Sequence, residues 1–197
     1  TSQLLVEGNT AGSAGGGLVS IGGAHVLVEN GATVVIAKNE ASRSHSGGVF
    51  LQDVGTTLHA SGEGTQLRVE GNTAGSYGGG LELINGASVL VENGATVIIT
   101  NNEASAYGGG LYSQSGSHVL VENGAKLFIT NNTAGERGGG LAMHNNCSFL
   151  VDGGAECWIE SNVARSLGNG LGGGMYIYSD STVTASGKGT LLRLERN

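Results

Sequence analysis

The stretch Ile99-Thr-Asn-Asn-Glu-Ala-Ser-Ala-Tyr-Gly-Gly-Gly-Leu111 decides the fold, because copies of it recur along the chain. Ungapped copies span 69–81 and 129–141, and copies with slips or insertions span 6–18, 36–49 and 159–175. The asparagines that anchor the copies are separated by 30, 33, 30, 30 and 30 residues and are Asn9, Asn39, Asn72, Asn102, Asn132 and Asn162. A nearly constant period of this size is typical of stacked structural repeats.

Each repeat contains three short apolar runs separated by glycine-rich breaks. In one repeat the runs are Leu81–Ile84, Val89–Glu92 and Val97–Thr100. Apolar and polar residues alternate in them, which is typical of β-strands, and none is long enough for a stable helix. We therefore predict an all-β fold, a right-handed parallel β-helix with about six coils of ~30 residues and three strands per coil.

The alternation also identifies the side chains that point inward. In the first strand these are Leu18, Val49, Leu81, Leu111, Leu141 and Met175. In the second strand they include Val26, Leu58, Val89, Val119, Phe149 and Val183, and in the third Val6, Ile36, Val69, Ile99, Ile129, Ile159 and Leu194. A slip of one residue would turn each set outward, so the pattern specifies the register.

The anchor asparagines have a structural interpretation. Asparagines stacked on successive coils form an amide ladder that satisfies backbone groups at a turn. The glycine triplets allow a positive φ or a close backbone approach at the neighbouring corner. Both columns are therefore expected to belong to the scaffold and not to a binding site.

Composition agrees with a single elongated domain covering 1–197. The chain has 38 glycines, no proline and a formal net charge of -7. The absence of proline is consistent with strands in which every backbone N–H is paired. The negative net charge argues against a nucleic-acid partner. No apolar stretch reaches the length of a membrane span. The first and last residues both resemble the third strand of a coil, so we expect the chain to begin and end mid-coil as a fragment of a longer array.

Two rows of outward-facing apolar residues form a candidate docking face. One row is Ile98, Phe128 and Trp158 on successive third strands, and the other is Leu90, Leu120 and Leu150 on successive second strands. Contiguous apolar stripes indicate a covered surface, although ordinary strand propensity explains them as well. We interpret them as a docking face for a neighbouring rod, a loop or a partner.

The two cysteines, Cys147 and Cys157, both have inward parity on either side of a corner. Two buried free thiols and a disulfide across the corner are both consistent with this placement.

The charged residues suggest no catalytic, cofactor or metal site. Glu92, Glu122 and Asp152 align on three coils, but they lack the Asp-rich loop of a calcium site, so a solvated acidic row is favoured. We call the turns that contain the glycine triplets the glycine-side turns. They carry Arg43, His45, Arg137 and Arg165, which form no compact acid–base set. We therefore predict no catalytic residue and no cofactor.

The repeat resembles those of a known protein family. Ile99-x-x-Asn102 followed by Gly108-Gly-Gly-Leu111 is similar to the Phe-x-x-Asn and Gly-Gly-Ala-Ile/Leu repeats of chlamydial polymorphic outer-membrane proteins, and the resemblance spans nearly the whole chain. It implies a right-handed β-helix displayed at a cell surface with an adhesive or structural role. The chain departs from that pattern by having Ile or Val in place of Phe and a third Gly in place of Ala.

These observations favour a non-catalytic, extracellular or cell-surface, structural or adhesive protein. Its expected partners are copies of itself or neighbouring subunits, stacked end to end or laterally, and host or matrix surface molecules. The alternatives are a polysaccharide lyase, hydrolase or epimerase, an interpretation that rests on the fold alone, and a carbohydrate- or ice-binding module. An ice-binding face requires a regular threonine array, and Lys126 and Glu156 interrupt the Thr33/Thr96 column.

Overall fold

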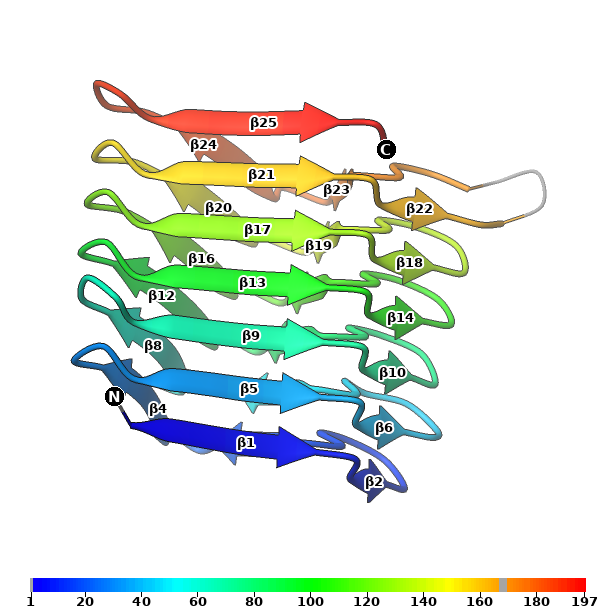
Figure 1. Cartoon of the computed structure of the whole chain (residues 1–197). Coiled ribbons are helices and arrows are strands. Elements are labelled where there is room, and N and C mark those ends of the chain that lie inside the picture. Colours follow the sequence, from blue (N-terminus) through cyan, green and yellow to red (C-terminus); the bar gives the residue numbers. More distant parts are fainter. Residues whose placement is uncertain (1, 167–169) are drawn as a thin grey trace.

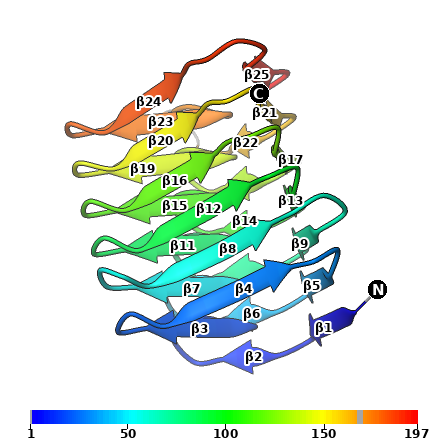
Figure 2. The ribbon, with the colours of Figure 1, turned by 90° about the vertical axis from the view of Figure 1, so that its left-hand side faces the viewer.

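The computed structural model describes residues 2–166 and 170–197, which form a right-handed parallel β-solenoid of about six coils (Figure 1). The described residues contain strands and turns and no helix, so none of them forms a helix that could cross a membrane. Figure 2 shows the coils stacked one above another, with the two termini at opposite ends of the stack. The predicted fold class is confirmed.

Four parallel sheets, which we name A to D, run the length of the solenoid. Sheet A consists of β1 (Gln3–Glu7), β5 (Thr33–Ala37), β9 (Gln66–Glu70), β13 (Thr96–Thr100), β17 (Lys126–Thr130), β21 (Glu156–Glu160) and β25 (Leu191–Glu195). Sheet B consists of β2 (Thr10–Ala11), β6 (Glu40–Ala41), β10 (Thr73–Ala74), β14 (Glu103–Ala104), β18 (Thr133–Ala134) and β22 (Val163–Ala164).

The other two sheets complete each coil. Sheet C consists of β3 (Leu18–Ile21), β7 (Val49–Gln52), β11 (Leu81–Ile84), β15 (Leu111–Gln114), β19 (Leu141–His144) and β23 (Met175–Tyr178). Sheet D consists of β4 (His25–Glu29), β8 (Thr57–Ser61), β12 (Ser88–Glu92), β16 (His118–Val121), β20 (Ser148–Val151) and β24 (Thr182–Ala185).

The prediction of three strands per coil is wrong, because sheet B adds a fourth strand of two residues. Glu103 and Ala104 pair with Thr73 and Ala74 on one side and with Thr133 and Ala134 on the other. A two-residue strand is too short to show alternation in the sequence, although its inward alanine, Ala104, is fully buried.

The predicted core is confirmed in the central coils. Leu81, Val89 and Ile99 point inward and are at most 2% exposed. Predicted core residues of the terminal coils are more exposed, because a neighbouring coil covers only one side of them; Leu194, at 48% exposed, is an example. The continuous apolar interior is the main source of stability, since burial stabilises by roughly 25 cal/mol per Å² of apolar surface.

The corner between sheets D and A is a tight turn. In the coil that contains β12, Asn93 and Gly94 both have positive φ, at 55° and 80°, and Ala95 N–H donates to the carbonyl of Glu92 at 3.1 Å. Two successive positive φ angles characterise a type I′ turn, in which Asn-Gly is the preferred pair. The turn thereby explains why Val-Glu-Asn-Gly-Ala recurs along the chain.

Candidate functional site

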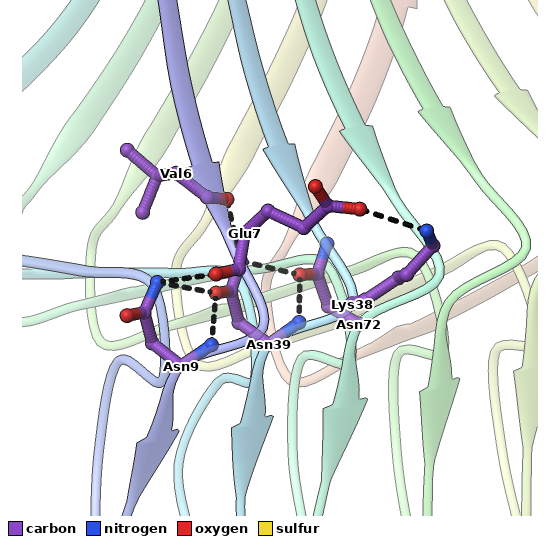
Figure 3. Close-up of polar contacts among 6 residues, drawn as sticks. All are labelled: Val6, Glu7, Asn9, Lys38, Asn39 and Asn72. Carbon is purple, nitrogen blue, oxygen red and sulfur yellow. Dashed lines mark hydrogen bonds and ion pairs between the residues drawn. The ribbon is translucent and has the colours of Figure 1, made fainter.

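The predicted asparagine ladder is present at the corner that connects sheets A and B (Figure 3). The Oδ1 atom of Asn102 accepts hydrogen bonds from the backbone N–H of Asn72 at 2.9 Å and from its Nδ2 at 3.0 Å. The Nδ2 atom of Asn102 donates to the Val69 carbonyl at 2.9 Å and to Oδ1 of Asn132 at 3.0 Å. Every hydrogen-bonding position of this buried amide is therefore used.

The same geometry repeats on each rung from Asn39 to Asn162 and satisfies buried backbone groups that the turn leaves unpaired. Asn197 forms a further rung that was not predicted from the sequence, and its Oδ1 accepts hydrogen bonds from the backbone N–H and Nδ2 of Asn162. Asn197 lies 35 residues after Asn162, so it is out of step with the period that identified the others.

Each glycine of the Gly108-Gly109-Gly110 triplet occupies a different tight position. Gly108 has φ +64°, and a Cβ there would lie 2.4 Å from the carbonyl oxygen of Leu111. A Cβ on Gly109 would meet the backbone of Thr133 in the next coil at 2.3 Å, and one on Gly110 would lie 2.8 Å from Nδ2 of Asn132. The triplet therefore lets the turn fold back onto sheet C while packing against sheet B and the ladder.

This turn buries the outer face of sheet C, a burial that the alternation of the strands does not predict. Glu82 and Tyr112 have outward parity in β11 and β15 and lie side by side in the sheet register, yet they are 0% and 3% exposed. The residues that cover this face belong to the glycine-side turns, and they include His45, Tyr77 and Tyr107.

A histidine–carboxylate pair fixes one of these turns. His45 Nδ1 lies 2.8 Å from Oε1 of Glu82, and the backbone N–H of Ser46 donates to Oε2 at 3.0 Å. The hydrogen bond to Glu82 raises the pKa of His45, and desolvation opposes the shift. Both oxygens of the buried carboxylate are thus engaged, so the pair holds the turn on the sheet and offers no free carboxylate to a substrate.

Aromatic side chains continue from this pair along the solenoid axis. The rings of Tyr77 and Tyr107 stack with centroids 5.5 Å apart, and the ring of His144 stacks on Tyr107 at 5.4 Å. The guanidinium of Arg137 lies over the rings of Tyr107 and Tyr176, at 5.5 and 5.2 Å from their centroids. Burial, followed by the nearby charge of Arg137, lowers the pKa of His144.

Two of the four residues predicted on the glycine-side turns share one face of the solenoid, but they are not in contact with each other. His45 and Arg137 both lie on the face over sheet C, at separate positions along the aromatic row. Arg165 instead forms an ion pair with Glu103, at 3.5 Å between Nη1 and Oε1. Tyr77 and Tyr107 each stand directly before a glycine triplet, one coil period apart. This spacing is the feature of the sequence that identifies the face.

The two predicted apolar rows align as expected. Ile98 pairs with Phe128, which pairs with Trp158, and the last two rings stack at 4.7 Å and 6°. The second row pairs in the same way through Leu90, Leu120 and Leu150. All six side chains are half-buried on the outer faces of sheets A and D, and what docks on them stays a prediction.

The cysteines form no disulfide in this structure: Cys147 and Cys157 are free and buried. Strand β20 and the turn that follows it lie between the two cysteines in the sequence. Burial raises the pKa of the Cys157 thiol.

In the acidic row that was considered for calcium, the carboxylate of Glu92 has other partners. Oε1 of Glu92 accepts a hydrogen bond from Nδ2 of Asn93 at 3.1 Å and lies 3.0 Å from Nε2 of His59. Over residues 2–166 and 170–197, no three His, Cys, Asp or Glu side chains converge in a way that could hold a metal ion.

Comparison with known proteins agrees with this architecture. A family model described as a right handed beta helix region matches residues 24–188, which is most of the chain. No curated protein sequence and no solved structure matches the chain. The parallel sheets, apolar columns and asparagine ladder agree with this match, and the chain belongs to the right-handed β-helix family.

Proposed function

We propose that this chain is a non-catalytic structural or adhesive rod at the outside of a cell, which associates laterally through its outer sheet faces. The observation that carries the proposal is the pair of in-register apolar rows on sheets A and D, in which six large side chains occupy consecutive coils. Apolar surface of this continuity is a common feature of association faces.

The internal contacts support a rod. Amide, aromatic and backbone hydrogen-bond rows all run along the solenoid axis, so each coil is stabilised by the coils above and below it. A repeat array of this kind presents a long, regular surface whose contacts multiply with the number of coils. Such a surface is suited to many weak lateral contacts with a second copy, a neighbouring subunit or a matrix molecule.

The His45–Glu82 pair and the aromatic row do not favour a polysaccharide-acting enzyme or a carbohydrate-binding module. General acid–base catalysis requires a carboxyl group within reach of the substrate, and the Glu82 side chain is 1% exposed. The Tyr77 ring stacks on the rings of Tyr107 and Tyr112, and the Tyr107 ring also stacks on His144, which leaves mainly ring edges for a sugar. We therefore advance no second function.

Lateral association tests the proposal. The double substitution Phe128→Ser and Trp158→Ser removes two stacked rings of one row, and we expect it to abolish self-association in analytical ultracentrifugation and in electron micrographs of concentrated protein. Val54→Ser is the matched control, because Val54 is 81% exposed and belongs to neither row. Association that persists in the double variant, with an unchanged far-UV circular dichroism spectrum, would show that this row is not the contact.

A further inference from the structure

All five tyrosines of the chain lie on one face of the solenoid. Tyr77 and Tyr107 stand on the glycine-side turns, whereas Tyr112, Tyr176 and Tyr178 stand on the strands of sheet C that these turns adjoin. Their rings form a continuous series of contacts with centroid separations between 5.0 and 6.3 Å, interrupted only by His144. The packing of the core does not require this placement, since these side chains point away from the solenoid interior.

Tyr77 and Tyr107 are the best-matched pair in the series. They occupy equivalent positions on adjacent coils and are joined by a parallel β-bridge. Their ring centroids are 5.5 Å apart with an interplanar angle of 29°. Both side chains are half-buried and reachable from solvent, whereas Tyr112, which stacks on Tyr77 at 5.0 Å, is 3% exposed.

We propose that Tyr77 and Tyr107 are a site of oxidative modification, at which a carbon–carbon bond forms between the ring carbons ortho to the two hydroxyl groups. The oxidant is hydrogen peroxide acting through a haem peroxidase. The product is a dityrosine that joins two adjacent coils covalently. This inference does not depend on the proposed association of the rods.

The oxidation and the coupling conserve atoms and electrons. Each phenol loses one electron and one proton and becomes a tyrosyl radical, and the two radicals couple at their ortho carbons. The hydrogen atom on each of these carbons then leaves as a proton while the phenolic oxygens regain protons, so both rings become aromatic again. The two electrons and two protons that the pair has lost convert one hydrogen peroxide into two waters.

The surroundings suit this step. Burial and the adjacent carboxylate of Glu136 raise the pKa of Tyr107, so this phenol is protonated at neutral pH and must release its proton when it is oxidised. The Glu136 side chain is exposed and offers a base at that position. The backbone pairing of the two turns holds the rings next to one another, which favours coupling within the chain over coupling between chains.

The test is peroxidase treatment of the full chain with hydrogen peroxide at low protein concentration. We expect the blue fluorescence of dityrosine in a monomer that has lost two hydrogen atoms in mass, and a proteolytic fragment that contains both Tyr77 and Tyr107. The unfolding temperature is expected to rise, because the new bond restricts the unfolded chain. Tyr77→Phe and Tyr107→Phe should each lose the fluorescence, whereas the control Tyr178→Phe should keep it.

Each substitution retains the aromatic ring, so the fold is expected to persist and circular dichroism verifies it. Three outcomes would overturn the proposal: undiminished intramolecular coupling in Tyr77→Phe, a cross-linked fragment that joins Tyr176 and Tyr178 instead, or dityrosine found only in dimers formed between chains.

Discussion

Replacing Asn102 by alanine tests the asparagine ladder at its centre. The substitution removes four hydrogen bonds, with lengths of 2.9, 3.0, 2.9 and 3.0 Å. It leaves the backbone N–H of Asn72 and one Nδ2–H of Asn72 without acceptors in a region that is 0–1% exposed. An unsatisfied buried polar group costs about 1–3 kcal/mol, so the two donors together cost roughly 2–6 kcal/mol.

That loss is large compared with the ~5–15 kcal/mol by which folded domains are usually stable. Urea unfolding followed by far-UV circular dichroism measures it, and hydrogen exchange of peptides covering 70–75 and 100–105 locates it. The local readout matters because stacked repeats unfold in segments when one interface weakens.

Asn9→Ala is the matched control. Asn9 lies on an exposed rung, where its Nδ2 donates to Oδ1 of Asn39 and to the carbonyl of Glu7. Removing this side chain leaves no buried donor unpaired, so we expect a cost below about 1 kcal/mol. Equal losses for the two variants, or less than about 1 kcal/mol for Asn102→Ala, would refute the reasoning.

Two further predictions concern the turns. Gly110→Ala should lower the free energy of unfolding in urea by about 1–3 kcal/mol or more, because the new methyl group would lie 2.7 Å from the carbonyl oxygen of Gly140. Gly12→Ala is the control: nothing lies within 4 Å of the added atom, so the free energy of unfolding should change by less than ~0.5 kcal/mol. His45 has a raised pKa in the folded chain, so its pairing with Glu82 stabilises below the ordinary value of 6.5, and that stabilisation is lost as the pH rises through the folded pKa. The stability difference between the native chain and His45→Gln should therefore shrink from pH 5.5 to pH 9; a difference that is constant or grows would contradict the assignment.

The sequence predicts those parts of the fold that repeat along the chain. Apolar alternation identifies the inward positions, such as Leu81 and Ile99, because a strand with one buried face must repeat with period two. The asparagine ladder is equally predictable, because asparagines that recur with the period of the coil lie next to one another on successive coils.

Features that depend on one turn folding back were not predictable in this way. Glu82 has the outward parity of a solvent-facing residue, and its burial results from the turn that carries His45 and Ser46. The two-residue strands of sheet B are too short to create a pattern. The tyrosines on the glycine-side turns do recur at the coil spacing, but their stacking against sheet C depends on a tertiary contact.

The distance between residues 3 and 156 tests the stacking of coils most directly. The two positions occupy one column of sheet A, linked by five register steps through Thr33, Gln66, Thr96 and Lys126. Spin labels are placed on Gln3→Cys and Glu156→Cys, with Cys147 and Cys157 replaced by alanine. At about 4.8 Å per step, pulsed electron–electron double resonance should give a narrow distance distribution centred at about 24 Å. A broad distribution, or a distance of roughly twice that value, would contradict a solenoid of parallel, in-register coils.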